Sequence, residues 1–366
     1  MESPHEQGRT PHQRFHRLAR PQQVPAFSHT LKFAVGVFVI VCALLPETTA
    51  VSLTSTLPLL AHLIAFPTLL GTLIAVVGLV MTITALRHRS WPGSAAGSMW
   101  VVGGLCFILF PAGVMAPPAA QQHTITRPMT IIVYNTGTQL TSGDVTELVT
   151  RFDPDIMVFP ESSDTEVADV LRDCDFHGHI YGAPDTGLPS SYSGGVAPTS
   201  MAVSSRLGPA HLVTGPVTSF GTVSLAFTNP RLPRVVGIHT APPLPGLRAD
   251  WKSDLERVVA FGEHSEQPLV IAGDFNATLR HGALAHERRR LVDSAQQCGT
   301  ERQGTWPVSI PDQWRAQIDH VLTTPQLLAT HCTVARVGSS DHAAYVTTVS
   351  PPPVSYTHLR AHETLR

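Results

Sequence analysis

Charged residues are scarce in this chain of 366 residues: Asp, Glu, Lys and Arg together make up 14% of it, and the formal net charge is −2. A surface that follows many backbone phosphates needs a basic excess, so avid and unselective nucleic-acid binding is disfavoured. The five Cys show no CxxC or Cys/His spacing, and the sequence therefore predicts no zinc site. No internal repeat is visible, which argues against a repeat architecture.

The cysteines divide between two kinds of sequence. Cys42 and Cys106 lie in apolar runs, whereas Cys174, Cys298 and Cys332 belong to the later, more polar part of the chain. For these last three we favour the interpretation of buried, small apolar thiols. The alternative is one disulfide among them, and the sequence does not identify which pair would form it.

Apolar residues make up 43% of the chain and accumulate before residue 116. A helix needs roughly 20 apolar residues to cross about 30 Å of hydrocarbon. Three uncharged runs approach or exceed this length, so we predict three transmembrane helices, the first extending into flanking Thr and Ala residues. The runs cover residues 33–45, 59–86 and 98–115.

Basic residues predict how these spans are oriented, because Lys and Arg are retained on the cytoplasmic side. Several Arg precede the first run, Arg87 and Arg89 lie between the second and third, and only Glu47 follows the first. The N-terminal tail and the second loop are therefore predicted to be cytoplasmic. An odd number of crossings then places everything after Met115 on the extracellular face of the cell membrane.

The chain is thus predicted to have four parts. Residues 1–30 form a cytoplasmic basic tail, residues 31–116 a membrane anchor, and residues 117–350 a globular domain large enough for one core. Residues 351–366 follow three prolines, lack periodicity and resemble translated adaptor or vector sequence, so we interpret them as a non-native tail.

From Met129 onward, short apolar runs alternate with polar stretches of helical period. Nearly continuous apolar strands indicate sheets that are covered by another layer on one face and by helices on the other. The sequence therefore predicts an α/β or α+β layered fold. The predicted strands are 129–135, 155–161, 200–206, 223–229, 234–240, 269–276, 318–324 and 342–349, and the predicted helices are 142–152, 164–171 and 248–264.

Polar side chains stand at or just after the ends of several predicted strands: Asn135, Glu161, His239, Asp274 and Asn276. Ligand sites of layered α/β proteins gather at such strand ends. Each residue also has a structural interpretation when taken singly, since Asp-x-Asn after Gly makes a good turn or helix N-cap. Five such residues at strand ends make coincidence improbable, so we predict that they line one crevice.

A further acid and imidazole occur near the end of the globular domain. The stretch "GSSDHAAY" places Asp341 and His342 after a Ser-rich turn and before an apolar strand. Asp341 offers a carboxylate for a hard cation, and the imidazole has an unperturbed pKa that suits proton transfer. Asp319, in the preceding strand, can accept the second N–H of the His342 ring and fix its tautomer.

These stretches, taken together and in this order, resemble the endonuclease/exonuclease/phosphatase superfamily of metal-dependent phosphoesterases. They are "VYNTG", "DPDIMVFPE", "MAVSSRLG", "GIHTAPP", "GDFNAT", "GTWP", "IDHVL" and "SSDHAAY", and they span about residues 129–350. With the preceding spans, the chain looks most like the membrane-anchored bacterial members, some of which are associated with glycopeptide resistance. The resemblance implies a four-layer sandwich of two packed mixed β-sheets flanked by helices.

The resemblance also implies a role for each candidate residue. Asn135, Glu161 and Asp341 would hold or surround Mg²⁺ or Mn²⁺, which prefer oxygen ligands. The residues implied in catalysis are Asp274 and Asn276, which would orient the attacking water and the phosphoryl group, and His239 and His342, the latter backed by Asp319, which would contact phosphoryl oxygens and exchange protons. The general base is assigned to Asp274 or to the Asp319/His342 pair.

Two departures from the nucleases of this family bear on the substrate. The segment after Asn135 is Thr-Gly and lacks a second Asn or Asp, and the Arg and Tyr residues that nucleases place on DNA have no counterpart. Our leading hypothesis is an outward-facing, membrane-anchored phosphoesterase that hydrolyses a lipid-linked phosphate ester or pyrophosphate. The alternatives are an extracellular Mg²⁺-dependent endonuclease and a catalytically inactive binding module on the same fold.

Overall fold

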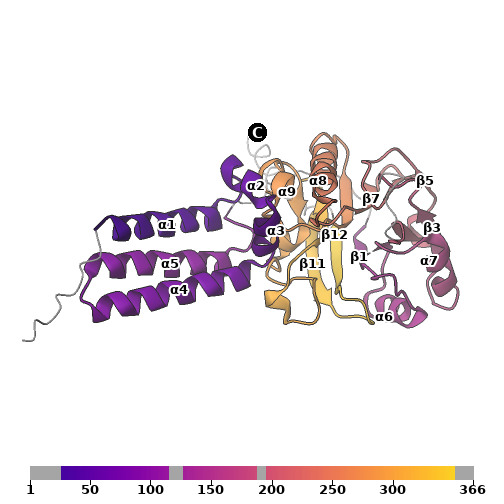
Figure 1. The fold of residues 1–366 in the computed structure, drawn as a ribbon. Coiled ribbons are helices and arrows are strands. Elements are labelled where there is room, and N and C mark those ends of the chain that lie inside the picture. The colour runs from indigo at the N-terminus through magenta and orange to yellow at the C-terminus, as the bar shows by residue number, and fades with distance from the viewer. Residues whose placement is uncertain (1–25, 115–126, 188–194, 351–366) are drawn as a thin grey trace, which may run out of the picture.

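The computed structural model describes residues 26–114, 127–187 and 195–350. The predicted basic tail lies outside this range except for residues 26–30, and the predicted domain boundary at residue 116 and the non-native tail 351–366 also lie outside it. Figure 1 shows a set of long helices beside a layered α/β part, which is the globular domain. The helices of the first part are α1 (Ala26–Leu44), α2 (Thr49–Ser55), α3 (Pro58–Ile64), α4 (Pro67–Arg87) and α5 (Trp91–Leu109).

Three long helices, α1, α4 and α5, lie side by side and form the helix bundle (Figure 1). Within the described residues, α4 and α5 are each long and apolar enough to cross a membrane. Residues Ser28–Leu44 of α1 meet the same criterion together with α2, from which they are bent by 85°. The chain therefore has two helices that can span a membrane, or three if the bent pair is counted.

The predicted spans are shifted relative to the helices, because caps and prolines, not hydropathy alone, set where a helix begins. The run 59–86 is not one helix: it breaks after Ile64, and α4 starts at Pro67, which needs no N–H partner in a first turn. The third helix begins at Trp91, well before residue 98, because the Ser90 side chain accepts the Gly93 N–H.

Glycines bring α4 and α5 into close contact. A Cβ on Gly71 would lie 2.5 Å from the Gly104 carbonyl oxygen, and one on Gly97 would lie 2.4 Å from the Thr82 hydroxyl oxygen. No side chain larger than hydrogen fits at such distances. Small residues let membrane helices approach closely and gain packing contacts, so this interface is of the kind found between transmembrane helices.

The globular domain contains two six-stranded sheets packed face to face. The first has the order β11 (Leu328–Ala335), β12 (Ala344–Ser350), β1 (Met129–Val133), β2 (Ile156–Phe159), β4 (Ser200–Ser204) and β3 (Gly178–Gly182). The second has the order β5 (Ala210–Leu212), β6 (Thr222–Phe227), β7 (Arg234–His239), β8 (Leu269–Asp274), β10 (Asp319–Thr323) and β9 (Val292–Asp293). The pairs β1–β2 and β7–β8 are parallel, and all other pairs are antiparallel.

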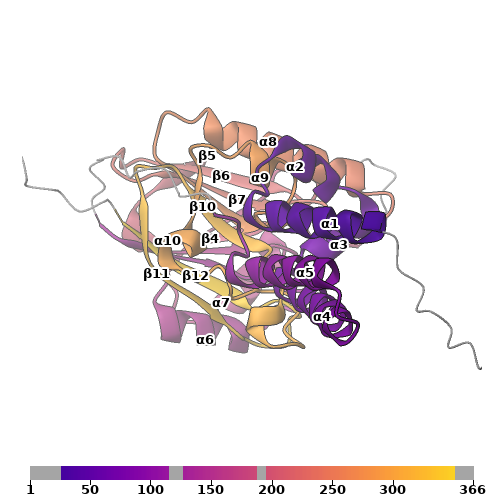
Figure 2. The same ribbon diagram turned by 90° about the vertical axis from the view of Figure 1, so that its left-hand side faces the viewer.

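Apolar contacts hold the four layers together. Ile131 and Val158 of the first sheet pack against Val235 and Val270 of the second, and helices cover the two outer faces (Figures 1 and 2). The predicted four-layer sandwich of mixed sheets is thus confirmed. The remaining helices are α6 (Ser142–Phe152), α7 (Asp164–Leu171), α8 (Arg248–Glu263), α9 (Gly282–His286), α10 (Ser294–Cys298) and the 3₁₀ turns η1 (Ser205–Leu207) and η2 (Asp312–Trp314).

All eight predicted strands and the three predicted helices are present, with ends shifted by a few residues. Strands β3, β5, β9 and β11 were not predicted. Two of them are very short, β3 begins and ends in glycine, and β11 has polar residues between its apolar ones. Pairing with a neighbouring strand, and not a local apolar pattern, makes these segments extended.

The interpretation of three free thiols in the globular domain is wrong. Cys298, at the end of α10, forms a disulfide with Cys332 of β11, while Cys174 remains free. The two cysteines are separated by 34 positions in the sequence, with a Cα–Cα distance of 6.0 Å. Only the packing of α10 beside β11 brings them together, and no local pattern in the sequence records it.

A buried arginine of the globular domain joins it to the helix bundle. Arg280 donates hydrogen bonds to the carbonyl oxygens of Cys42 and Ala43 near the end of α1, and to those of Phe110 and Pro111 just after α5. A cation near a helix C-terminus is favourable because the last carbonyl groups have no partner within the helix. The bundle therefore makes a specific polar contact with the globular domain.

Candidate active site

Three neighbouring strands of the second sheet bring polar side chains to one level. His239 is paired with Asp274 in the parallel register of β7 and β8, and Asp274 is paired with Asp319 in the antiparallel register of β8 and β10. Gly273 permits this approach, because a Cβ there would lie 1.9 Å from the Ile238 carbonyl oxygen. The strand ends of the second sheet thus supply an imidazole and two carboxylates in one row.

The first sheet contributes two more polar residues. Asn135 and Glu161 each lie two residues beyond the ends of the parallel strands β1 and β2. The Asn135 amide donates to Asp274 Oδ2 at 2.9 Å and to Glu161 Oε1 at 3.3 Å. Asn135 therefore connects the carboxylates contributed by the two sheets, and the site lies where the ends of both sheets meet.

Asn276 forms the turn expected after Asp274 and also contacts another candidate site residue, His239. The Asp274 side chain accepts the Asn276 N–H at 2.7 Å, which is the local turn expected for Asp-x-Asn. The Asn276 amide donates to the Thr240 carbonyl oxygen at 2.9 Å and lies 3.3 Å from His239 Nε2. Asn276 and Glu161 both adopt positive φ, 47° and 63°, a backbone strain that is common at functional sites.

A buried imidazole completes the group. His342 Nδ1 lies 2.9 Å from Asp319 Oδ2, the hydrogen bond expected from the sequence, and His342 Nε2 lies 3.9 Å from Asp274 Oδ2. Asp274, Asp319 and His342 each offer one possible metal-ligand atom, and these atoms all lie within 4.8 Å of one another. The structure thus brings residues far apart in sequence into one oxygen-rich pocket.

Asp341 differs from the other candidates because its side chain is exposed. Its carboxylate accepts the Trp306 indole N–H at 2.7 Å, and its charge acts on both Glu161 and His342. The Trp306 ring lies 6.4 Å from the His342 ring, measured between centroids. Asp341 therefore lies at the rim of the pocket, with Trp306 beside it.

Burial and mutual charge shift the pKa values in the pocket. Burial, followed by the charge of Asp319, raises the pKa of Asp274 to about 7, and burial also raises that of Glu161. Burial lowers the pKa of His239 to about 3. Burial acts to lower the pKa of His342 too, but its ion pair with Asp319 and the charges of Asp274 and Asp341 outweigh burial and raise this pKa to about 9.

The residues present fit a divalent cation. Asp319 Oδ1 is buried and has no hydrogen-bond partner, which is costly for a carboxylate oxygen. Burial, with smaller contributions from neighbouring carboxylates, raises the pKa values of Asp274 and Glu161, so their ionised forms are disfavoured here. A cation would relieve both, and a set of carboxylate and amide oxygens suits Mg²⁺ or Mn²⁺ better than a metal that prefers thiolates.

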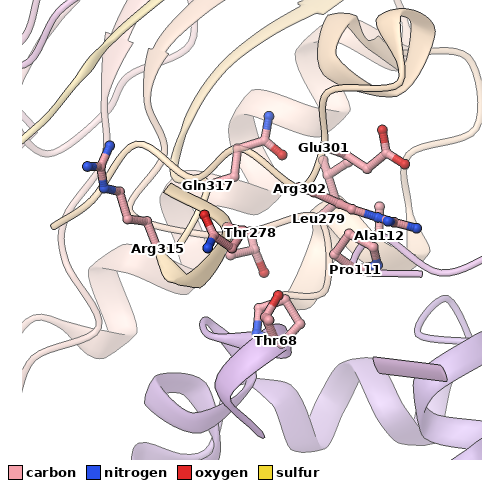
Figure 3. Close-up of a pocket in the computed structure, with 11 residues that line it drawn as sticks. Thr68, Pro111, Ala112, Thr278, Leu279, Glu301, Arg302, Arg315 and Gln317 are labelled. Carbon is pink, nitrogen blue, oxygen red and sulfur yellow. The ribbon is translucent and has the colours of Figure 1, made fainter. Parts of the chain in front are cut away.

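A cavity lies between the helix bundle and the globular domain (Figure 3). Thr68 and Pro111 line it from the helix side, and Thr278, Arg315 and Gln317 line it from the domain side. Its volume is about 20 Å³, enough for a water molecule but not for a phosphorylated substrate. It contains none of the predicted site residues, so the crevice around Asp274 remains the candidate active site.

Two features of this region were not found from the sequence. Trp306 was quoted only as part of "GTWP", yet it touches both His342 and Phe66, whose ring centroid lies 6.1 Å from that of Trp306. Arg280 and His281 follow the "GDFNAT" stretch and bind the helical part. The signal available was the polar pair Arg280-His281 one residue after "GDFNAT", but its partners lie more than 160 residues away in the sequence.

Solved structures with a similar arrangement were found at low sequence identity. D. rerio TDP2 complexed with single strand DNA product is 15% identical, covering 61% of this chain and 99% of that chain, with a TM-score of 0.47. An endonuclease/exonuclease/phosphatase from Beutenbergia cavernae is 17% identical, covering 62% and 72%, with a TM-score of 0.43. A functionally unknown protein from Enterococcus faecalis is 12% identical, covering 61% and 100%, with a TM-score of 0.45.

Comparison with curated proteins gave no match. A sequence model described as the Endonuclease/Exonuclease/phosphatase family matches residues 132–342, which is more than half of the chain. The matched range begins in β1 and ends at His342, so it includes the candidate site from Asn135 onward. The chain therefore belongs to the endonuclease/exonuclease/phosphatase family.

Proposed function

We propose that this protein is a membrane-anchored, metal-dependent phosphoesterase that faces outward and hydrolyses a lipid-linked phosphate ester or pyrophosphate. The observation that supports it most directly is the buried group of Asp274, Asp319 and His342, with a carboxylate oxygen that has no protein partner. A packed structural cluster would satisfy that oxygen. Members of this family are typically hydrolases of phosphate esters, and the pocket has the donors that such chemistry needs.

Glu161, Asn135 and Asp341 are the residues that we propose to hold the ion, with Asp274 and Asp319 close enough to add oxygen ligands. Bound Mg²⁺ or Mn²⁺ would neutralise charge on the phosphoryl oxygens and lower the pKa of a coordinated water. Exposed Asp341 lies at the rim, where it can meet the ion or the substrate from the solvent side.

The protein's own groups supply the proton transfers. Asp274, whose pKa is raised to about 7, can take a proton from the attacking water near neutral pH. His342, whose pKa is raised to about 9, is protonated at that pH and can donate from Nε2 to an oxygen of the phosphoryl or leaving group. Asp319 holds the His342 ring by its Nδ1, which leaves Nε2 free to face the substrate.

His239 and Asn276 have a different part in this scheme. Because burial lowers the pKa of His239 to about 3, its imidazole is neutral and acts as a hydrogen-bond partner, not as a cation. Its Nε2 faces the Asn276 amide, while its buried Nδ1 has no partner. Together, the two side chains can position a phosphoryl oxygen beside Asp274.

Two features support an outward-facing domain. The disulfide between Cys298 and Cys332 is typical of oxidising compartments outside the cytoplasm. Arg87 and Arg89 are at the turn between α4 and α5, and this turn is at the end of the helix bundle remote from the globular domain (Figure 1). Basic loops are retained in the cytoplasm, which favours an extracellular location for the domain.

The lipid-linked substrate is favoured by proximity and by charge. A tether to the membrane raises the effective concentration of any substrate confined to the same surface. The formal net charge of −2 provides no general attraction for a polyanionic nucleic acid. A phosphorylated lipid headgroup therefore fits the chain better than DNA does.

Activity tests separate these substrates. The full chain, purified in detergent with Mg²⁺, is expected to release phosphate from a polyprenyl pyrophosphate and to leave plasmid DNA intact. Asp274→Asn serves as the matched inactive control, since it keeps the shape of the side chain and removes its basicity. DNA nicking without lipid turnover would contradict the proposed substrate.

Orientation has its own test. An alkaline phosphatase fused after residue 120 is expected to be active, because that enzyme folds only outside the cytoplasm (a property of the reporter), and a fusion after His88 is expected to be inactive. The reverse pattern would overturn the outward location without affecting the proposed chemistry.

A further inference from the structure

We propose that α2 and α3, together with Trp314, form a membrane-docking surface that lies at the boundary between lipid headgroups and acyl chains. The partner is a phospholipid bilayer, on the side that carries the globular domain. This inference rests on the proposed membrane anchoring and deepens the proposed function, because it sets the height of the active site above the membrane.

One face of the α2–α3 segment is bonded to the globular domain. The Ser52 hydroxyl donates to the Gly282 carbonyl oxygen at 2.9 Å, and the Gly282 N–H donates to the Ser55 hydroxyl at 3.0 Å. His281 Nδ1 accepts the Thr278 N–H, so its Nε2 carries a hydrogen and donates to the Ala61 carbonyl oxygen at 2.9 Å. The segment is therefore fixed on the globular domain through small and polar residues.

The remaining surface of the segment is open and mostly apolar, with Thr54 and His62 exposed among leucines. Leu59 is 71% exposed, and four further leucines around it are exposed as well. No Asp, Glu, Lys or Arg occurs between Glu47 and Arg87. A contiguous apolar patch of this kind is rare on a water-exposed surface and marks a site of interaction. The other exposed leucines are Leu53, Leu57, Leu60 and Leu63.

The geometry of the chain selects a bilayer as the partner for this patch. The segment connects α1 directly to α4, and α2 is bent from α1 by 85°. If α1 crosses the membrane, α2 must run nearly parallel to its plane. Figure 1 shows α2 and α3 at the level where the long helices meet the globular domain. Apolar helices in this position lie in the interface.

Two exposed tryptophans mark the two ends of the helix bundle. Trp314 is 43% exposed and belongs to η2, which contacts α4, while Trp91 is 83% exposed and begins α5 at the opposite end of the bundle. Helix α4, with 21 residues, is about 32 Å long. This length matches the hydrocarbon core, and Trp is enriched at both of its boundaries. Trp314 therefore independently supports the level assigned to α2 and α3.

This placement has a consequence for the substrate. The segment 274–282 starts with Asp274 in the active site and ends with Gly282, which is hydrogen-bonded to Ser52 and Ser55 of α2. On the opposite side, Phe66, between α3 and α4, contacts Trp306, which contacts His342. Both connections are short, so the active site lies close to headgroup height. A phosphate on a membrane lipid can reach it without leaving the bilayer.

Spin-label depth measurements test the surface directly. The full chain, with Cys42, Cys106 and Cys174 replaced by Ala, receives a single nitroxide at Leu59→Cys in vesicles of phosphatidylethanolamine and phosphatidylglycerol. Leu73→Cys on α4 serves as the deep control, and Lys252→Cys on α8 as the aqueous control. We expect the label at position 59 to be shielded from a water-soluble nickel chelate and open to oxygen, at a depth shallower than position 73.

The outcomes separate this inference from the proposed function. A label at position 59 that meets the nickel chelate as freely as one at position 252, while position 73 is deep, would overturn the docking surface and leave the anchoring intact. A label at position 73 that is open to the chelate would overturn the anchoring itself.

Activity gives a second readout. Leu59→Glu is expected to lower turnover of a polyprenyl pyrophosphate in vesicles roughly tenfold, equivalent to about 1.4 kcal/mol. Hydrolysis of water-soluble bis(p-nitrophenyl) phosphate should be unchanged. Leu212→Glu, on exposed β5 of the globular domain, is the matched control and should leave both activities unchanged. Equal rates of Leu59→Glu and the unmodified chain on the lipid substrate would contradict the docking surface.

Discussion

Two buried Asp–His pairs lie in the same globular domain, and they have different surroundings. His320 Nδ1 lies 2.7 Å from Asp293 Oδ2, and its Nε2 lies 2.9 Å from the Ala277 carbonyl oxygen, so both ring nitrogens are bonded. His342 Nδ1 lies 2.9 Å from Asp319, but the nearest acceptor to its Nε2 is Asp274 at 3.9 Å. The first pair is complete within the protein, and the second has a free nitrogen.

The carboxylates differ in the same way. Asp293 Oδ1 accepts the N–H groups of Ala295 and Gln296 and caps α10, whereas Asp319 Oδ1 is buried without a partner. Burial of an unpaired polar atom is unfavourable, and native proteins tolerate it mainly where another molecule completes the bonding. Between these two Asp–His pairs, the one in the candidate active site differs by its unsatisfied carboxylate oxygen and ring nitrogen.

The largest effect is expected from His342→Ala. If its free Nε2 donates to the substrate, the phosphoesterase rate should fall by about 10²- to 10⁴-fold, the range for loss of a general acid. The unfolding temperature should fall as well, because the buried Asp319 carboxylate loses its imidazole partner, so the rate is compared per folded molecule. Phosphate release and thermal unfolding of the same preparation measure both. If His342→Ala retained its activity, the unbonded Nε2 of His342 would have no catalytic role, and the two Asp–His pairs would both be structural.

Asp293→Ala should lower stability without lowering the phosphoesterase rate. It removes the cap of α10 and leaves His320 buried without its carboxylate, which is expected to lower the free energy of unfolding by about 3–5 kcal/mol. Chemical denaturation of the full chain measures this loss. The rate per folded molecule should be retained, and a selective loss of rate without loss of stability would show that the first pair also takes part in catalysis.

The same distinction explains what could be predicted from the sequence. Asn135, Glu161, Asp274 and His342 stand out because each polar side chain follows or precedes a buried strand, and short-range patterns record this. The partner of His320 is Asp293 on an edge strand of two residues, and no such pattern identifies it. The pairing of β9 with β10 brings Asp293 to His320.

The first part of the chain gives a parallel case. Apolar content predicted the helices that are long enough to span a membrane, and Phe66-Pro67 carried the information for the break between α3 and α4. The bonds of Arg280 to α1 and α5, and the disulfide between Cys298 and Cys332, join segments that only the folded chain brings together. Local composition determines where helices and strands form, whereas long-range packing determines which side chains contact one another.

His281 extends the comparison to an imidazole that is fully bonded but held neutral. Burial lowers its pKa to about 4 from the ordinary value of 6.5. Above pH 6.5 neither state is protonated and its contribution is fully present; as pH falls toward 4, the unfolded chain binds the proton first and stability is lost. The loss is expected to reach about 3 kcal/mol at pH 4.

Unfolding of the full chain at pH 7.5 and pH 4.5 measures this dependence. His281→Gln cannot titrate in this range, so the difference between the two pH values should be smaller for this variant than for the unmodified chain. An identical difference in both proteins would assign the acid sensitivity to other groups.

The smallest effect is expected from Arg280→Lys, which keeps the buried charge but loses the planar donor geometry. Arg280 bonds to carbonyl oxygens of both α1 and α5, and a single ammonium group cannot reach all of them. The free energy of unfolding should fall by about 2 kcal/mol, the value for one or two lost bonds to a charged group. Because Arg280 is fully bonded like His320, hydrolysis of a water-soluble ester should change little. A clear loss of that activity per folded molecule would contradict this expectation. It would show that the helix bundle positions Asp274 and Asn276 through residues 277–279, so that a fully bonded residue also affects catalysis.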